Sequence, residues 1–455
     1  MSDKHGLEEA VGDVGKIKRV ESVVDLKKKE VEANQKIVKS KKKVEKTIEP
    51  SEVYGLTELP ILIREYGIRL FTKDTDKLDI INSFLETNQT EDAFYIINLA
   101  SVIQRYEKWQ KFLPRIVPYY AVKCNPDSVI LQILAFLGAC FDVASKNEII
   151  AVSDLDVTPD RIIFANPVKF TSHIKFAKSQ DVDMMTFDTP DELFKVKLYH
   201  PRAKLVLRIK TDDKDSVCKF SCKFGCDLAE VESLLMLAKT LELNVIGVSF
   251  HVGSNCGNPQ QYASAIRDAR TTFDIAEKLG IKMTLLDIGG GFSDREGEKI
   301  TFEETARIIN ESLDEYFPNE DIRIIAEPGR YMVEASHILV FSVVGKKKIV
   351  KDGEIMFRYF MNDGVYGSFN CIFFDHAKPL LVPFSQRSDK KYPSVCYGPT
   401  CDSVDLINST PIMLPELSVG DVMFVENFGA YVHTKSAVVD FNGFSGNKSQ
   451  YILTH

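Results

Sequence analysis

The sequence predicts an α/β protein built on a (β/α)8 barrel, with a second, mostly β domain at the C-terminal end. Two observations carry this prediction. From residue 119 to 330, short β-branched and aromatic runs alternate with longer helical segments, and eight such units fit the length and rhythm of a closed parallel barrel. After residue 330 the pattern changes to strands and turns without long helices. A doubly wound open sheet is the alternative, but eight units without a break favour closure.

The barrel strands are predicted from eight short runs. In chain order they are YYAVK, FDVAS, RIIFANP, DMMTF, KLVLRI, NVIGVSFHV, TLLDIGGG and IRIIAEPG. The segments between them, such as NPDSVILQILAFLG and TPDELFKVKLYH, have apolar residues at helical spacing.

The chain divides into four predicted regions. Residues 1–52 form a charged tail that has too little apolar surface to offset its ordering entropy, so we expect it to be disordered. Residues 53–118 hold a strand and a helix in DAFYIINLASVIQRYEKWQKFLP, and we expect this strand to join the β domain. The barrel spans 119–330 and the β domain 331–455. Its strands are expected in HILVFSVVGKKKIV, EIMFRYFMNDG, DVMFVENFGAYV and SAVVDFNGF.

Composition excludes several classes of protein. A chain of 455 residues with 44% hydrophobic residues can bury a sizeable core. The net charge of -8 and the pI near 5.7 give no global attraction to nucleic acid or to an anionic membrane. Apolar runs are too short to span a bilayer, and the N-terminus has charges where a signal peptide needs apolar residues. We therefore expect a soluble cytoplasmic protein.

The nine cysteines are scattered, which indicates reduced thiols rather than a disulfide framework. One cluster, CKFSCKFGC, spaces Cys218, Cys222 and Cys226 at intervals of four. These intervals fit neither a zinc site nor the common iron–sulfur spacings, and no histidine lies among them. No metal site is predicted.

Polar residues stand where the predicted strands end, and in barrels of this kind the chemistry lies at those ends. The first strand ends at Lys123, the second carries Asp142, the fifth ends near Arg208, the sixth carries His251 and the eighth ends in Glu327. Each alone has an ordinary structural explanation, such as a strand-end lysine that reaches solvent. Their convergence on one rim predicts a site.

The loops after the seventh and eighth strands predict a phosphate site. DIGGGF contains Gly289, Gly290 and Gly291, and EPGRY contains Arg330. Backbone N–H groups at glycines can cradle a dianion in these loops. A lysine, a phosphate cradle, a carboxylate and an imidazole on one rim suit pyridoxal phosphate, whose aldehyde a lysine can capture.

The chain closely resembles the eukaryotic ornithine decarboxylases, of the alanine-racemase-like fold type III class of pyridoxal phosphate enzymes, from about Ala93 to Phe444. The matching strings are PYYAVKCNPD, FDVASKNEI, RIIFANP, SFHVGSNC, LDIGGGF, IIAEPGRY, NDGVYGSFNC, GPTCDSVD, ENFGAY and FNGF. The resemblance implies decarboxylation of L-ornithine to putrescine and CO2, the first step of polyamine biosynthesis.

The resemblance also implies roles around the cofactor. Lys123 would form the Schiff base, Glu327 would pair with the pyridine nitrogen, and His251 would stack on the ring. Asp142, Glu148 and Arg208 match residues around the Schiff base. The remaining implied cofactor residues are Ser254, Gly289, Gly290, Gly291, Pro328, Gly329, Arg330 and Tyr431.

GPTCDSVD would supply the substrate half of the site. In the family, the cysteine at Cys401 protonates the α-carbon, while Asp402 and Asp375 meet the distal ammonium of the substrate. Phe374 and Phe441 match pocket walls. Because this segment reaches into the partner's pocket in the family, a homodimer with shared active sites is implied, and antizyme is a further implied partner.

The chain departs from the family pattern at three places. Phe374 stands where the family usually has Tyr, which removes a hydroxyl and could relax the preference between ornithine and lysine. CDSVD replaces the more usual CDGLD, and the segment before Phe441 is about two residues longer than usual.

Two alternatives therefore stay open: a lysine/ornithine decarboxylase of relaxed specificity, and a non-catalytic antizyme-inhibitor-like protein. Diaminopimelate is disfavoured, because its distal carboxylate would meet carboxylates of the same sign at Asp375 and Asp402.

Overall fold

The computed structural model describes residues 57–87, 91–212, 214, 216–218, 220–295, 297–385, 388–432, 441–444 and 446–455. The predicted tail 1–52 lies outside these residues, as do most of the strand predicted in SAVVDFNGF and the side chain of Phe441. Within the described residues, no helix has the length and apolarity needed to cross a membrane.

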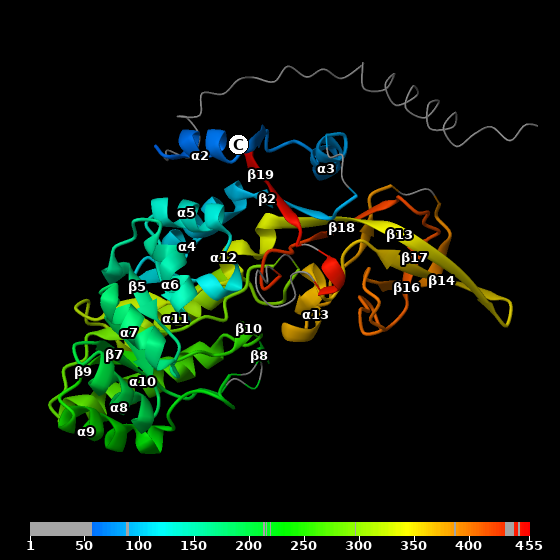
Figure 1. Ribbon diagram of the computed structural model, residues 1–455. Helices are drawn as coiled ribbons and strands as arrows, with labels where there is room; N and C mark the ends of the chain where they lie inside the picture. The colour runs from blue at the N-terminus through cyan, green and yellow to red at the C-terminus, as the bar shows by residue number, and fades with distance from the viewer. Residues whose placement is uncertain are drawn as a thin grey trace, which may run out of the picture. The chain divides into compact units, whose positions relative to one another are not determined.

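The predicted barrel is confirmed: eight parallel strands close on themselves, with the last strand bonded to the first (Figure 1). Side chains from seven of these strands pack together in one buried cluster that includes Tyr119, Ile163, Val206, Leu285 and Ile325. The interior is therefore a packed core, and the strand ends are the places where chemistry can be displayed. The strands are β3 (Ile116–Ala121), β4 (Cys140–Val143), β5 (Ile162–Phe164), β6 (Met184–Phe187), β7 (Lys204–Arg208), β9 (Asn244–Ser249), β11 (Leu285–Asp287) and β12 (Arg323–Ala326).

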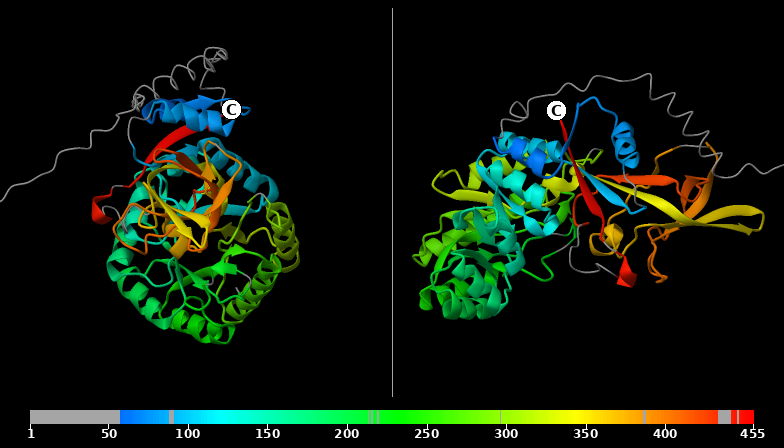
Figure 2. Two further views of the ribbon diagram at one scale, coloured as in Figure 1. Left: turned by 90° about the vertical axis from the view of Figure 1, so that its right-hand side faces the viewer. Right: turned by 45° about the horizontal axis from the view of Figure 1, so that its top comes forward.

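Helices surround the barrel, as the left view of Figure 2 shows. Side-chain caps fix where several of them begin: the Asp127 carboxylate accepts from Val129 N and Ile130 N, and the Ser145 and Thr301 hydroxyls cap two more. The helices are α5 (Ser128–Phe136), α6 (Lys146–Ser153), α7 (Thr171–Ser179), α8 (Pro190–Tyr199), α9 (Val231–Thr240), α10 (Gln260–Lys278), α11 (Phe302–Tyr316) and the short α12 (Arg330–Val333).

Two strand ends differ from the prediction. β3 ends at Ala121, so Lys123 lies in a 3-10 turn, Val122–Cys124, rather than on the strand. The turn is closed by the Tyr120 hydroxyl, which donates to the Asn125 carbonyl at 2.8 Å. His251 likewise lies two residues beyond the end of β9. The residue at which a strand ends depends on tertiary contacts of this kind. These contacts cannot be predicted from a run of β-forming residues alone.

The second domain is one nine-stranded sheet, ordered β1-β19-β2-β13-β14-β16-β17, with β18 on β13 and β15 on β18. β13 (His337–Lys351) pairs first with β2 (Phe94–Asn98) and β18 (Val422–Glu426), and after an irregularity at Val343–Gly345 with β14 (Glu354–Met361). The strand before the barrel, β2, thus lies within this sheet. The other strands are β1 (Arg69–Phe71), β15 (Val382–Pro383), β16 (Lys391–Tyr397), β17 (Ile412–Pro415) and β19 (Lys448–Thr454).

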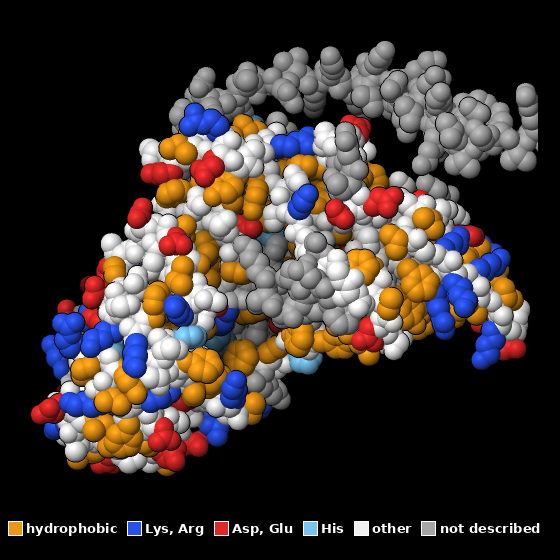
Figure 3. Space-filling view, in the orientation of Figure 1, with side chains coloured by type: hydrophobic (Ala, Val, Ile, Leu, Met, Phe, Trp, Pro, Cys, Tyr) orange, Lys and Arg blue, Asp and Glu red, His pale blue; other side chains and the backbone are white. Residues whose placement is uncertain are grey.

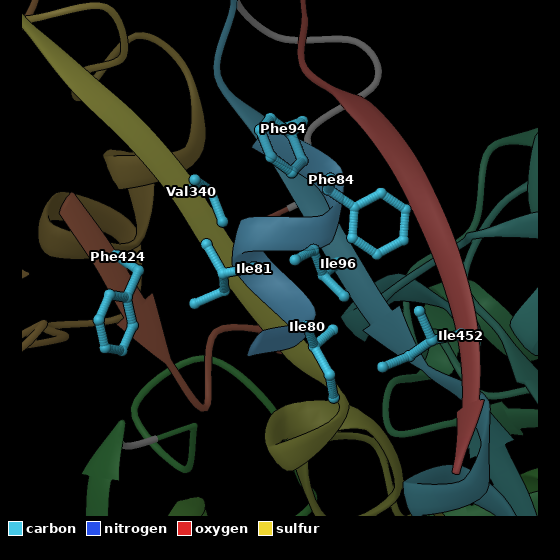
Figure 4. Packing of buried hydrophobic residues seen from close by; sticks show 8 residues of the cluster. All are labelled: Ile80, Ile81, Phe84, Phe94, Ile96, Val340, Phe424 and Ile452. Carbon is cyan, nitrogen blue, oxygen red and sulfur yellow. The ribbon is translucent and has the colours of Figure 1, made fainter. Parts of the chain in front are cut away.

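Helix α3 (Lys77–Leu85) covers one face of this sheet (Figure 4). Asp76 caps it by accepting from Leu78 N at 2.7 Å. Helix α3 and the sheet share one buried cluster of apolar side chains, and burying each of them contributes ~1.5–3 kcal/mol of stability. This cluster therefore holds β2 and β19 in the sheet. Its members are Ile80, Ile81, Phe84, Phe94, Ile96, Val340, Phe424 and Ile452.

The end of the β13–β14 hairpin carries a group of basic side chains (Figure 3). Lys347, Lys348, Lys351 and Arg358 are exposed, and Lys346 pairs with Glu416 at 2.7 Å. The exposed basic side chains lie in solvent on the hairpin that extends from the sheet.

Hydrogen bonds join the loop after β3 to the β domain. The Asn125 side-chain amide donates to the Gly429 carbonyl at 2.9 Å and lies 3.1 Å from His337 Nε2. Tyr431 N donates to the Cys124 carbonyl at 2.9 Å. The two residues that follow Lys123 are therefore held by the β domain. Helices α2 (Leu59–Glu65), α4 (Leu99–Phe112) and α13 (Cys371–Phe374), and the ribbon β8 (Ser216–Cys218) and β10 (Ser254–Cys256), complete the fold.

Candidate active site

Lys123 stands at the mouth of the barrel, tied to an acid on the next strand. Ala121 is opposite Asp142 in the β3–β4 register, and the Lys123 ammonium donates to Asp142 Oδ2. The Lys123 side chain is 39% exposed, whereas that of Asp142 is fully buried. Asp142 Oδ1 has no hydrogen-bond partner among the described residues. The amine is thus tethered from beneath and open to a ligand from the solvent side.

Neighbouring acids keep this lysine protonated. Burial lowers the pKa of Lys123, but the negative charges of Asp142 and Glu327 outweigh that effect, so the pKa is raised above its ordinary value. An amine attacks a carbonyl only after it loses its proton. Lys123 therefore has to give up this proton before it can react with a carbonyl.

Glu327 follows β12 and interacts with Asp287, the last residue of β11. Burial raises the pKa of Glu327 well above its ordinary value, and the nearby Asp287 and Asp142 raise it further. Burial likewise raises the pKa of Asp287 to about 7. Gly289 N donates to Asp287 Oδ1 at 2.9 Å, and Glu327 N donates to the Gly289 carbonyl at 2.7 Å. Two buried acids thus share one corner of the rim.

Asp287 was not among the predicted site residues. The available signal was its place in LDIGGGF, at a strand end and two residues before the first glycine. Sequence reasoning treated this string as a phosphate loop alone, and therefore missed the acid that perturbs Glu327.

His251 packs against the glycine loop. Its Nδ1 accepts from Gly253 N at 3.0 Å, which leaves Nε2 to carry the proton of the neutral ring. Burial lowers the pKa of His251 well below its ordinary value, and the positive charges of Arg208 and Lys123 lower it further. A Cβ at Gly290 would lie 2.9 Å from His251 Nε2, so this approach requires glycine.

The other two glycines have backbone angles that favour glycine. Gly289 has φ +65° and Gly291 has φ +106°. A Cβ at Gly289 would lie 2.1 Å from the Phe250 carbonyl oxygen, and one at Gly291 would lie 2.4 Å from the Gly253 carbonyl oxygen. The loop after β11 can therefore lie directly against the loop after β9.

Arg330 begins α12 and gathers acids from two domains. Its Nη1 lies 3.1 Å from Glu334 Oε1, and its Nη2 lies 2.7 Å from both carboxylate oxygens of Asp375. Ser254 Oγ is 3.5 Å from Nη2, and the guanidinium carbon is 5.3 Å from the centre of the Tyr431 ring. Arg330 Nε is buried and has no hydrogen-bond partner among the described residues.

Two of the remaining predicted cofactor residues shape the backbone around Lys123. The Pro328 carbonyl accepts from Ala121 N at 3.1 Å. A Cβ at Gly329 would lie 2.9 Å from Cys124 Cβ, so glycine there lets the loop after β12 pack onto the turn of Lys123.

Glu148 and Arg208 lie near the rim but have partners of their own. Glu148 Oε2 accepts from Ala144 N at 2.7 Å, within the first turn of α6. Burial lowers the pKa of Arg208, although Glu327 and other acids oppose this effect, and its guanidinium lies 5.1 Å from the Phe224 ring centre. Glu148 therefore stabilises a helix start, and Arg208 adds positive charge beside the acids.

The residues predicted for the substrate half are positioned differently. Cys401 is exposed, and its N–H donates to Asn442 Oδ1 at 3.1 Å. Asp402 Oδ2 accepts from the Tyr366 hydroxyl at 2.5 Å. Phe374 is 73% exposed at the end of α13. All three residues lie on the β domain, where Cys401 and Phe374 are exposed, whereas Asp375, the next residue after Phe374, reaches the barrel at Arg330.

A buried aspartate anchors the loop that carries Cys401. Asp405 is 1% exposed and accepts from Val365 N at 2.8 Å, from Thr400 N at 3.1 Å and from the Thr400 hydroxyl at 2.7 Å. A Cβ at Gly364 or Gly398 would overlap its carboxylate. Asp405 was missed from sequence, although it lies four residues after the cysteine.

The structure thus brings one group of predicted residues together at the barrel mouth: Lys123, Asp142, Arg208, His251, Ser254, Gly289, Gly290, Gly291, Glu327, Pro328, Gly329, Arg330, Asp375 and Tyr431. The hydrogen bonds given above for Cys401 and Asp402 run to Asn442 and Tyr366, within the β domain.

Comparisons with known proteins identify the family of this chain. The family model for the pyridoxal binding domain of pyridoxal-dependent decarboxylases matches residues 99–334, and the chain belongs to this family. Ornithine decarboxylase of Mus pahari is 47% identical over 392 residues, which cover 83% of this chain and 84% of the relative. Antizyme inhibitor 2 of Xenopus laevis is 49% identical over 388 residues, 82% of this chain and 84% of the relative.

A solved structure shares this fold over most of the present chain. The arginine decarboxylase of Paramecium bursaria Chlorella virus matches with a TM-score of 0.78 at 38% identity, covering 82% of this chain and 100% of that chain.

Proposed function

We propose that this protein is an ornithine decarboxylase, which converts L-ornithine to putrescine and CO2 with pyridoxal 5'-phosphate and so begins polyamine synthesis. The observation that carries the proposal is the Lys123 amine, open to solvent at the barrel mouth and tied from below to buried Asp142. Glu327 and the Arg330 side chain lie around the same mouth.

The residues at the mouth fit this cofactor. Arg330 Nε–H is buried and has no acceptor among the described residues, and Ser254 Oγ lies 3.5 Å from Arg330 Nη2. A side chain at Gly291 would clash with the Gly253 carbonyl, so the backbone there is bare. These groups, with Tyr431, suit a phosphate, and Lys123 suits an aldehyde. When bound, pyridoxal phosphate supplies an electron sink for the electrons released as the α-carboxylate leaves.

The acids around the rim have separate tasks. A carboxylate at Glu327 beside the ring nitrogen would keep that nitrogen protonated, because an opposite charge favours the charged form. His251, neutral and fixed by Gly253, would cover one ring face. Asp142 holds the amine of Lys123 in place. After each turnover, its carboxylate can pair with the Lys123 ammonium again.

The substrate end is acidic. A distal ammonium in a mostly dry pocket needs anionic partners, and Asp375 and Asp402 are the carboxylates proposed to meet it. Cys401 would give a proton to the α-carbon after CO2 departs. Phe374 and Phe441 would line this end, and the missing hydroxyl at Phe374 leaves lysine as a second candidate substrate.

The exposure of Cys401 supports a homodimer. A thiol that protonates a carbon at the barrel mouth has to leave water, and on one chain this one faces outward. We propose that Cys401 and Asp402 of one protomer enter the pocket formed by Lys123 of its partner. A cytoplasmic location and binding to antizyme remain parts of this proposal.

A non-catalytic role is the alternative from another class. Overall identity does not choose between the two, because an antizyme inhibitor and an ornithine decarboxylase are about equally similar to this chain. The rim favours catalysis, since the lysine, the buried acids and the glycine loop are all retained.

The test is CO2 release from L-ornithine, L-lysine, L-arginine and diaminopimelate in parallel, with and without added pyridoxal phosphate. We expect the highest kcat/KM with ornithine. A higher value for lysine or arginine would change the assigned substrate. No release from any substrate at saturating cofactor would favour the non-catalytic role.

A further inference from the structure

Arg330 contacts the carboxylates of two acids. Glu334 lies at Nη1 and both oxygens of Asp375 lie at Nη2. The side chains of Arg330 and Asp375 are only 11% and 9% exposed. Their attraction is therefore less screened than that of a surface pair. Arg295 also reaches Glu334, at 2.5 Å, and so offsets one of the two acids.

Among the described residues, Asp375 has no second cation comparable to Arg295. Apart from Arg330, the polar side-chain contact of its carboxylate among the described residues is Cys218 Sγ, at 3.9 Å. Asp375 belongs to the β domain and ends α13, whereas Arg330 belongs to the barrel. This ion pair thus connects the proposed phosphate site with the proposed substrate site.

A cofactor phosphate brings about two further negative charges to the same guanidinium. If Asp375 stays, a phosphate bound at this guanidinium would lie near a carboxylate, and like charges repel in a shielded site. If Asp375 leaves, it needs another cation. The proposed substrate carries one, the distal ammonium assigned above to Asp375.

We propose that Asp375 and the cofactor phosphate compete for Arg330, and that a diamine relieves this competition by drawing Asp375 to its ammonium. This inference rests on the proposed function and adds regulation to the same site. Because binding free energies are linked, the diamine raises the affinity for the cofactor by the same factor by which the cofactor raises the affinity for the diamine.

Three consequences distinguish this exchange from a simple structural ion pair. Asp375→Asn should bind pyridoxal phosphate about tenfold more tightly than wild type, within the 5–150-fold range of site-to-site coupling. Putrescine should tighten cofactor binding to wild type by a similar factor and have no effect on the variant. Pyridoxal, which has no phosphate, should bind both proteins equally.

The experiment is equilibrium dialysis of the full-length protein loaded with pyridoxal phosphate, followed by absorbance of the bound cofactor, with and without putrescine. Asp402→Asn is the matched control, because Asp402 is held by Tyr366 rather than by Arg330. It should weaken the effect of putrescine but leave cofactor affinity without putrescine unchanged. Asp375→Ser provides a second variant in case the first fails to fold.

The proposal is overturned if removing the Asp375 charge leaves cofactor affinity unchanged or lowers it, or if pyridoxal gains as much as pyridoxal phosphate. CO2 release is measured separately on the same samples. Normal decarboxylation with no competition rejects this inference alone, whereas competition without decarboxylation rejects the proposed function alone.

Discussion

The barrel mouth and the Cys401 loop are two halves of one proposed site, and they are built in opposite ways. At the mouth, Asp142 and Asp287 are fully buried and Glu327 is 8% exposed, each set by the end of a strand. In the loop, Cys401 is exposed and a single buried acid, Asp405, ties the segment down. One half is built within a chain, and we propose that the other is completed by the surface of a second copy.

This difference shows which half of the proposed site is energetically unfavourable to bury. Burying carboxylates without full pairing is unfavourable, and Asp142 Oδ1 and Asp287 Oδ2 both lack hydrogen-bond partners among the described residues. The rim carries that cost before any ligand arrives. The loop carries little of this cost, because Cys401 is exposed to solvent.

The largest expected effect is at Lys123. Lys123→Ala should lower decarboxylation by ~10³-fold or more, since the residue that holds the cofactor covalently is gone. Borohydride reduction followed by peptide mass analysis should find the cofactor on Lys123 in wild type. Lys123→Arg keeps the charge beside Asp142 but should be as inactive as the alanine variant. Normal turnover, with the cofactor trapped on another lysine, would refute the assignment.

The next effect is at Glu327. Glu327→Ala removes the charge proposed to hold the ring nitrogen protonated, and losing a positioned charge commonly costs ~10²–10³ in rate. Cofactor binding should persist through Arg330 and the glycine loop. Single-turnover decarboxylation measures the step directly. An unchanged single-turnover rate would mean that Glu327 has no part in the chemistry.

A smaller effect is expected in the exposed half. In Asp405→Asn, an NH2 group replaces one of the carboxylate oxygens that accept hydrogen bonds from Thr400 and Val365. A buried donor left without an acceptor costs ~1–3 kcal/mol. We expect a roughly tenfold fall in kcat, with cofactor attachment to Lys123 unchanged. Asp352→Asn, on the exposed β13–β14 turn, is the control and should behave as wild type. Loss of cofactor attachment would show that the two halves are not separate.

The smallest effect concerns stability. The pKa of Asp287 is about 7 in the folded protein and ~4 when unfolded, so the folded state holds the proton more tightly. The stability contributed by protonated Asp287 is full below pH ~4 and is lost as pH rises through 7.

Asp287→Asn does not ionise, so its stability relative to wild type should rise from pH 4 to 7, by at most ~4 kcal/mol, and then level off. Urea unfolding of the cofactor-free proteins at a series of pH values measures this difference. Parallel stability curves would contradict the buried, raised pKa.

The barrel could be predicted from sequence because its strands are continuous apolar runs with helices between them, and that pattern is local. Strand-end positions then grouped Lys123, Asp142, His251 and Glu327 on one rim. The parts that sequence missed depend on contacts between distant segments. Asp287 acquires its raised pKa from burial, and Asp375 reaches Arg330 only because the β domain folds back onto the barrel.

The substrate half shows the same limit. The resemblance names Cys401, Asp402 and Phe374, but nothing local to GPTCDSVD or FFDHA indicates that Cys401 and Phe374 face outward on one chain. Asp405 holds its loop through Val365 and Thr400, a contact that spans forty residues to Val365.

The most direct test of the two-half account mixes two inactive proteins. Lys123→Ala spoils the barrel mouth and Cys401→Ala spoils the loop. In a mixed dimer with two-fold symmetry, one pocket receives both changes and the other receives neither. With equal amounts and free exchange, half of the dimers are mixed and half of their sites are intact, so activity should recover to roughly a quarter of wild type. No recovery, with subunit exchange demonstrated independently and both parents inactive, would mean that Lys123 and Cys401 act within one chain.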